Sequence, residues 1–219
     1  MPRIALIHAL SHSVAPINEA FARDWPEATR MNLLDDSLSA DLAASGRGLD
    51  AFMHERFARL AQYAADCGSD AILFTCSAFG PCIEAVARQH AHLPVLKPNE
   101  AMVADAAKAG GGVGLIASFA PTLASMPAEF PAGVLQASAL AAGALDALNS
   151  GDGHRHDEQV VQAALQLKAQ GVSVIALAQF SMARARAPVM QRTGLPVLTT
   201  VDSAVAELRR RLSIAPVSR

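Results

Sequence analysis

The sequence predicts an α/β fold built from two similar lobes, each with a parallel sheet. Short apolar runs rich in β-branched residues alternate with longer stretches of helical spacing, which is typical of strand–helix units in parallel sheets. Segments of the first half recur in the same order in the second half, which indicates an internal duplication. Of the 219 residues, 52% are apolar and 17% are charged, so the chain can bury a sizeable core and is not intrinsically disordered.

Four apolar runs are predicted to be buried parallel strands, because they are short, continuous and rich in branched side chains. They are IALI at residues 4–7, AILF at 71–74, VGLI at 113–116 and VIAL at 174–177. Residues 49–65 and 159–170 have the spacing of amphipathic helices. Gly68 and Gly171 follow these helices and are predicted to end them, because glycine readily adopts the left-handed conformation of a helix C-terminus.

The duplication consists of matched blocks that keep their order along the chain. RFARLAQYAADCGSDAI at 56–72 aligns with QVVQAALQLKAQGVSVI at 159–175, RIALIHA at 3–9 aligns with GVGLIAS at 112–118, and LPVL occurs at both 93–96 and 195–198. The separation between matched blocks is nearly constant, which favours duplication over chance similarity. Two such lobes are expected to form a cleft, with ligands bound outside the carboxyl ends of the strands.

The residues that follow the predicted strands are therefore the candidate ligand contacts. These segments are small and rich in hydroxyl groups, which suits a small polar ligand held by hydroxyls and backbone amides. The candidates are His8, Ser11, Thr75, Ser77, Ser118, Thr122, Gln179 and Ser181. Capping of a helix is the alternative role of each hydroxyl, and the two roles are compatible at a helix N-terminus.

Cys76 is the candidate catalytic residue. It follows the strand at 71–74 and precedes a helix that is expected to start near Pro81. The positive end of a helix lowers the pKa of a nearby thiol, so we expect a thiolate that acts as a base or a nucleophile. A small, inert buried thiol is the alternative. Under the duplication, Gln179 takes the position of Cys76 in the second lobe.

Three motifs together resemble the aspartate/glutamate/hydantoin racemase superfamily, whose relatives include maleate isomerase and arylmalonate decarboxylase. They are FTCSAFG at 74–80, ASFAPTLAS at 117–125 and LAQFSMA at 177–183, and NLLDDSL at 32–38 extends the resemblance over essentially the whole chain. The resemblance implies two pseudo-symmetric flavodoxin-like lobes, residues 1–96 with 200–219 and residues 97–199, and an active-site cleft between them. It also implies no cofactor, and two cysteines, one per lobe, that exchange the proton beside a carboxylate.

On this resemblance Cys76 is the first family cysteine, and Gln179 stands where the second is expected. A glutamine amide cannot act as a base, so a single thiol is left. We expect a racemase- or isomerase-type enzyme that acts at the carbon alpha to a carboxylate or carbonyl group, with Ser77, Ser118 and Thr122 holding the carboxylate by family analogy. A single-cysteine decarboxylase, a catalytically silent carboxylate-binding protein and a thiol hydrolase are the alternatives.

Composition and charge limit which binding partners and which cellular compartment are expected. The formal net charge of −2 provides no basic surface for nucleic acid or an anionic membrane, and no apolar run reaches the roughly 18–20 residues that span a bilayer. The three cysteines match neither a disulfide scaffold nor a metal-binding spacing, so we expect a cytoplasmic protein without a metal site. The resemblance implies a small-molecule carboxylate substrate and a homodimer. The segment GDGHRHDE at 151–158 is predicted to be an exposed loop that leads into a helix, with Asp157 and Glu158 as acids of the first turn, and a metal site at His154 and His156 is the alternative.

Overall fold

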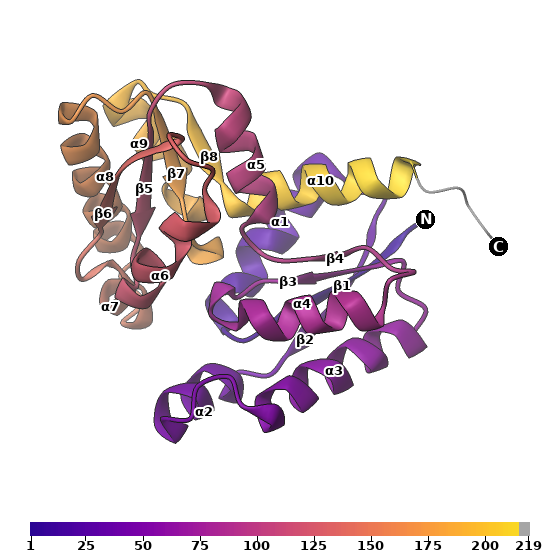
Figure 1. Cartoon of the computed structure of the whole chain (residues 1–219). Helices are drawn as coiled ribbons and strands as arrows, with labels where there is room; N and C mark the ends of the chain where they lie inside the picture. Colours follow the sequence, from indigo (N-terminus) through magenta and orange to yellow (C-terminus); the bar gives the residue numbers. More distant parts are fainter. Residues whose placement is uncertain (215–219) are drawn as a thin grey trace. The chain divides into compact units, whose positions relative to one another are not determined.

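The computed structural model describes residues 1–214 and confirms an α/β fold with two parallel sheets. The chain forms two compact units (Figure 1). The first unit comprises Met1–Pro98 together with the chain from Ala204 onward, and the second comprises Asn99–Ser203. Each unit contains one four-stranded sheet. No helix within residues 1–214 has both the length and the apolar character that a membrane span requires.

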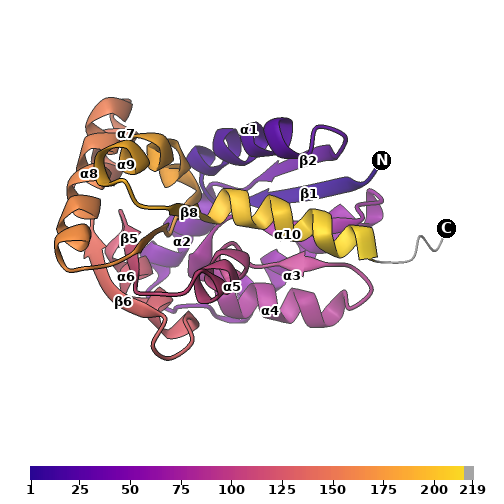
Figure 2. The ribbon, with the colours of Figure 1, turned by 90° about the horizontal axis from the view of Figure 1, so that it is seen from above.

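The first unit has a parallel sheet with helices on both faces. Its strands, in the spatial order β2-β1-β3-β4, are β1 (Arg3–His8), β2 (Thr29–Leu34), β3 (Ala71–Phe74) and β4 (Val95–Leu96). Its helices are α1 (Val14–Asp24), α2 (Ser37–Ser45), α3 (Ala51–Asp66), α4 (Gly80–Gln89) and, from Ala204 on, α10 (Thr200–Ile214). Figures 1 and 2 show α3 and α4 on one face of this sheet and α1 and α10 on the other.

Burial of both faces explains the continuous apolar runs of the first sheet. The runs predicted at 4–7 and 71–74 form β1 and β3, and their side chains are almost completely buried. On the face covered by α3 and α4, Ile7 and Phe74 pack with Phe57, Phe79 and Ile83. The ring of Phe57 lies 5.3 Å from that of Phe74 and 4.8 Å from that of Phe79, measured between centroids.

The second unit repeats this arrangement. Its strands, in the order β6-β5-β7-β8, are β5 (Val113–Ala117), β6 (Leu135–Leu140), β7 (Val174–Leu177) and β8 (Val197–Thr199). Its helices are α5 (Glu100–Ala109), α6 (Ala120–Ser125), α7 (Ala144–Asn149), α8 (Gly153–Ala169) and α9 (Arg186–Thr193). Alternate residues of β7 belong to separate cores, since Ile175 packs with Val160 of α8 whereas Ala176 packs with Met102 of α5.

Glycines end the two predicted helices as expected. Gly68 has φ = 73° and follows α3, and Gly171 has φ = 84° and follows α8. Both angles lie in the left-handed region that glycine adopts without a Cβ penalty. At the other end of α3, the side chain of Asp50 accepts a hydrogen bond from the backbone N–H of Met53 at 3.0 Å and caps the helix.

The prediction of an exposed loop at 151–158 is wrong. The side chain of Asp152 accepts a hydrogen bond from the backbone N–H of Arg155 at 2.9 Å, so α8 begins at Gly153, several residues before the predicted helix. His154 is exposed on the first turn, but His156 is completely buried and its Nδ1 lies 2.8 Å from a carboxylate oxygen of Asp157. A capping residue therefore extended the helix into a segment whose composition is typical of a loop.

Strand β6 was not predicted from the sequence. Its residues, LQASAL, alternate between partly buried and exposed positions, and small or polar side chains occupy most of them. Such a strand lacks the continuous apolar run that marks the central strands. Its alternation was the signal that could have found it.

Candidate functional site

The register of the sheets makes Cys76 and Gln179 equivalent within their own units. In the first sheet Ile7 of β1 pairs with Phe74 of β3, and in the second sheet Ile116 of β5 pairs with Leu177 of β7. Cys76 and Gln179 each follow the last strand residue by two positions. Both have extended backbones, with φ = −126° and −131°, and both precede a short 3₁₀ helix, η2 (Ser77–Phe79) and η4 (Phe180–Ala185) respectively.

Burial dominates the chemistry of the Cys76 thiol. Cys76 packs against the core cluster between the sheet and α3, and this burial raises the pKa of its thiol above the ordinary value. Hydrogen bonds from the backbone N–H of Ala78 and the hydroxyl of Ser39 act in the opposite direction but are the smaller causes. The predicted lowering of this pKa is therefore wrong, because desolvation outweighs the donors at the strand end. α4 does begin near Pro81, as predicted.

Ser39 is a neighbour of Cys76 that sequence reasoning missed. It lies on α2, and the single proton of its hydroxyl can be donated either to the Cys76 sulfur or, at 3.3 Å, to the carbonyl oxygen of Ala9. Around the thiol is a narrow crevice without room for a water molecule, and it is lined by Ile7, His8, Ala9, Leu38, Phe57, Phe74 and Cys76. No motif marks Ser39, because its contact with Cys76 depends on how α2 packs.

Alkylation of Cys76 is expected to be slower than that of an ordinary thiol. Because its pKa is raised, a smaller fraction is thiolate at pH 7, and the rate should keep rising with pH beyond the ordinary thiol pKa of about 8.5. The measurement is the pH dependence of iodoacetamide modification at Cys76, followed by peptide mass spectrometry. The urea-unfolded protein is the control, and faster modification of the folded protein at pH 7 would contradict the prediction.

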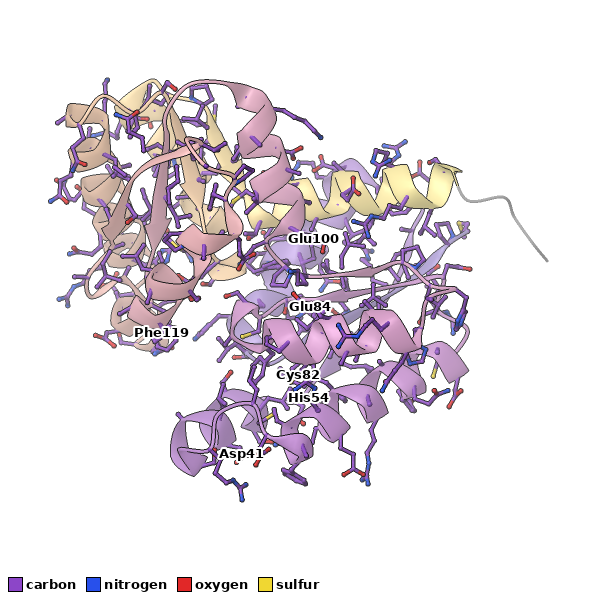
Figure 3. The ribbon with its side chains drawn as sticks, in the orientation of Figure 1. Asp41, His54, Cys82, Glu84, Glu100 and Phe119 are labelled. Carbon is purple, nitrogen blue, oxygen red and sulfur yellow. The ribbon has the colours of Figure 1, made fainter. Side chains whose placement is uncertain are left out.

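The other two cysteines have different surroundings. Cys82 lies on α4 (Figure 3), is buried in the core cluster of the first unit, and has a thiol pKa that burial and the charge of Asp50 raise to about 11. Cys67 is partly exposed, as Cys76 is, but it lies at the C-terminal cap of α3. Neither residue follows a strand of the sheet.

His8 is a buried link in a hydrogen-bonded chain. Nδ2 of Asn18 donates to Oδ1 of Asn32 at 2.8 Å, and Nε2 of His8 lies 3.0 Å from the same oxygen, so Nε2 carries a proton. Burial lowers the pKa of His8, and the neutral ring then accepts at Nδ1 from the hydroxyl of Thr75, 2.9 Å away. Both ring nitrogens are engaged, so this arrangement does not favour His8 as a second base or as the partner of a hydrolytic thiol.

Gln179 is held in one orientation by Ser118. Its Oε1 accepts hydrogen bonds from the backbone N–H of Ser118 at 2.6 Å and from the Ser118 hydroxyl at 3.1 Å. Because a backbone N–H can only donate, these contacts assign the oxygen and leave the amide nitrogen, Nε2, as a pure donor. Gln179 offers hydrogen bonds to a ligand oxygen but cannot take up a proton.

The remaining predicted residues are divided between buried and accessible positions. Thr122 on α6 and Ser181 on η4 are buried, whereas Ser11 on η1 (Ser11–Ser13) is exposed and Ser77 on η2 is partly buried. Direct side-chain hydrogen bonds join only two pairs of the predicted site residues within the described chain, His8 with Thr75 and Ser118 with Gln179. Among residues 1–214, no group of three His, Cys, Asp or Glu side chains is placed to hold a metal ion.

Comparison with known families decides the classification. The sequence profile of the family described as Asp/Glu/Hydantoin racemase matches residues 12–208. This chain belongs to the Asp/Glu/hydantoin racemase family. The resemblance found in the sequence motifs is thereby confirmed, and the chain is a racemase- or isomerase-type enzyme of this family. Comparison with curated protein sequences finds no match.

Solved structures share the fold of this racemase-family chain at low sequence identity. Glutamate racemase from Bacillus anthracis superposes with a TM-score of 0.74 and 14% identity, over 97% of this chain and 82% of that chain. Allantoin racemase from Klebsiella pneumoniae gives 0.71 and 19%, over 98% and 89%. A mutant of arylmalonate decarboxylase gives 0.67 and 18%, over 100% and 96%. These similarities establish the fold of the racemase-family chain.

Proposed function

We propose that this racemase-family chain is a cofactor-independent enzyme with one catalytic thiol. It acts at the carbon alpha to a carboxylate or carbonyl group of a small molecule, and Cys76 is the acid, base or nucleophile. The observation that carries the proposal is the pair of equivalent strand ends, of which one holds Cys76 and the other holds Gln179. Glutamine cannot exchange a proton at carbon, so the reaction has one thiol.

A resting thiol is suited to proton delivery. Because burial raises the pKa of Cys76, the free enzyme holds the proton on sulfur at neutral pH. In a decarboxylation, the bond between the alpha carbon and the carboxyl carbon breaks and CO₂ leaves. The electron pair of the broken bond stays on the substrate, which becomes an enolate. The Cys76 S–H then protonates the alpha carbon, and water returns a proton to the sulfur. Proton exchange at the same carbon requires the reverse transfer first, for which the Ser39 and Ala78 donors stabilise the thiolate.

Hydroxyls and amides at the strand ends are the proposed substrate contacts. This set comprises His8, Ser11, Thr75, Ser77, Ser118, Thr122, Gln179 and Ser181. His8 contributes by holding the Thr75 hydroxyl in place, because hydrogen bonds to Thr75 and Asn32 already engage both of its ring nitrogens. Gln179 presents the donors of Nε2, because the backbone N–H and the hydroxyl of Ser118 both donate to its oxygen, and Ser118 therefore acts within the set through Gln179. Donors at fixed positions stabilise the negative charge that develops on an enolate oxygen.

Proton NMR in D₂O tests the proposed function. The protein is incubated with aspartate, glutamate, 5-substituted hydantoins, maleate and arylmalonates, and each compound is also incubated without protein. We expect loss of an alpha-proton signal or a new deuterated product for at least one compound. Exchange without inversion indicates chemistry with one thiol, and a product that has lost CO₂ indicates decarboxylation. Full racemisation at the rate of exchange would contradict the assignment of a single proton-transferring side chain.

A catalytically silent binding protein is the second candidate. The raised pKa of Cys76 and the narrow crevice beside it, which has no room for water, favour this candidate, since an inert thiol has the same properties. Slow alkylation therefore does not separate the two candidates. A compound that raises the unfolding temperature but neither exchanges a proton nor forms a product would favour the binding protein.

A further inference from the structure

Helix α2 brings two side chains to the thiol of Cys76. The hydroxyl of Ser39 can donate to the sulfur, and Leu38 lines the narrow crevice beside it. Leu38 is almost completely buried, Ser39 and Leu42 are partly buried, and the other residues of α2 are exposed. The surroundings of the thiol therefore depend on a helix that buries little surface of its own.

Apolar packing alone is a weak anchor for α2. The helix has nine residues, and helices of this length are not stable in water without tertiary contacts. Elements that bury few apolar side chains open at a small cost in free energy, while the rest of the protein stays folded. Leu38 and Leu42 pack against the core of the first unit. Polar contacts are therefore expected to contribute to holding α2 against Cys76.

Arg56 of α3 supplies these polar contacts. Its Nη1 donates to Oδ2 of Asp41, on the second turn of α2, at 2.5 Å (Figure 3). Its Nη2 donates to the hydroxyl oxygen of Ser37, the first residue of α2, and to Oδ2 of Asp35, both at 2.6 Å. The Ser37 hydroxyl donates in turn to Oδ1 of Asp35 at 2.6 Å. One guanidinium group thus binds α2 at two points and also binds the chain that leads into it.

The ion pairs of Arg56 are more sheltered from solvent than that of its neighbour Arg59. The Arg56 side chain is 17% exposed, whereas that of Arg59 is 77% exposed and pairs with Glu55 of its own helix. Burial acts to raise the pKa of Asp35, but hydrogen bonds from Ser37 and Arg56 outweigh it and lower that pKa, so the carboxylate stays charged at neutral pH. Charge-assisted bonds of a sheltered guanidinium are stronger than exposed ion pairs.

We propose that Arg56 is a positioning residue that holds α2 against the Cys76 thiol. Its bonds to Asp35 and Asp41 fix the helix, and the fixed helix keeps the Ser39 donor at the sulfur. Arg56 acts on the reaction only through α2. The inference rests on the proposed function where it concerns catalysis, but the position of α2 can be measured without a substrate.

Alkylation of Cys76 measures how often α2 opens. In the intact Arg56→Gln variant α2 should open more often, and iodoacetamide should modify Cys76 about tenfold faster at pH 7, the effect of losing a hydrogen bond to a charged group. Cys82 is the reference within the same molecule, because it is 1% exposed in the core of the first unit and reports unfolding of that unit. Peptide mass spectrometry gives both rates, and their ratio separates local opening from a general loss of stability.

Three further variants complete the experiment. Arg56→Lys keeps the charge but lacks the fork that binds two carboxylates, so its Cys76 should be modified at an intermediate rate. Asp41→Asn removes one partner of Arg56, and Cys76 should again be modified faster. Because the Asp41 side chain is 55% exposed, this variant decides the question if Arg56→Gln does not fold. Arg59→Gln is the matched control on α3, and its Cys76 rate should stay within about twofold of the native rate.

Turnover gives a second readout once the NMR screen has identified a substrate. Arg56→Gln should lower kcat by about tenfold, because the Ser39 donor no longer stays at the sulfur. Arg56→Lys should restore part of this loss, and Arg59→Gln should leave kcat within about twofold. An equal kcat in the native protein and Arg56→Gln would overturn the positioning role.

The outcomes separate the role of Arg56 from the proposed function. Faster modification of Cys76 but not of Cys82, without turnover of any compound, would support the positioning of α2 and count against the proposed function. Turnover by the native protein, with Cys76 modified no faster in Arg56→Gln and Asp41→Asn, would overturn the positioning role and leave the proposed function intact. Equal acceleration at Cys76 and Cys82 would also overturn it, since Arg56 would then stabilise the whole unit and not the position of α2.

Discussion

Replacing Cys76 with serine is expected to lower turnover by about 10²–10⁴-fold, the contribution of a positioned acid or base. A serine hydroxyl has nearly the same shape but holds its proton too tightly to exchange it with carbon. The variant should keep its fold and its ligand affinity, because the side chain is small and lies among the same neighbours. The measurement is kcat for the best compound of the NMR screen, together with the thermal unfolding temperature and the ligand affinity.

Cys67→Ser is the matched control for this substitution. The same substitution of cysteine by serine can be made at Cys67, which belongs to the same unit but lies at the end of α3 and not at a strand end. Its replacement should leave turnover within about twofold, as is usual for surface substitutions away from a site. Unchanged turnover in Cys76→Ser, with the control also unchanged, would remove Cys76 from the reaction.

The pH profile gives Cys76→Ser a second readout. Since burial raises the thiol pKa, the protonated form persists to a higher pH than in an exposed cysteine. If the thiol delivers a proton, activity should be present at neutral pH and fall as the pH rises through the raised pKa. If the thiolate removes a proton, activity should instead rise through that pKa. Whichever of these two pH dependences the native enzyme shows, it should be absent from the residual activity of Cys76→Ser.

Local sequence signals predicted the central parts of both sheets. The runs at 71–74 and 174–177 match β3 and β7, because a strand buried on both faces needs a continuous apolar run. Gly68 and Gly171 end their helices because glycine readily adopts a positive φ, a property of the single residue that is visible in the sequence. The order of these blocks was enough to place Cys76 and Gln179 after equivalent strands.

Properties that depend on tertiary packing could not be predicted in the same way. The helix after Cys76 suggested a lowered thiol pKa, but α2 and α3 bring Leu38 and Phe57 close to the thiol and leave no room for water in the crevice that they line. Ser39 reaches the thiol for the same reason. His156 has polar neighbours in sequence and is nonetheless fully buried, since its burial is set by how α8 packs within the second unit.

Phe57→Ala is expected to lower the free energy of unfolding of the first unit by about 3–5 kcal/mol. The ring is 2% exposed and contacts those of Phe74 and Phe79, so its removal leaves a cavity that a close-packed core fills only in part. Urea unfolding followed by the fluorescence of Trp25 measures the loss. Trp25 is the single tryptophan of the chain and is buried in the same unit.

The same variant tests the cause of the slow alkylation expected for Cys76. Phe57 lines the crevice around Cys76, so its removal admits water and should lower the thiol pKa toward the ordinary value, making alkylation at pH 7 faster. Tyr63→Ala on α3 is the control, because Tyr63 is 57% exposed and its loss should cost within about 0.5 kcal/mol. If Phe57→Ala is destabilised but Cys76 in its folded state is alkylated no faster, burial by α3 does not set the reactivity of Cys76. The hydrogen-bond donors Ala78 and Ser39 would then be the groups to vary.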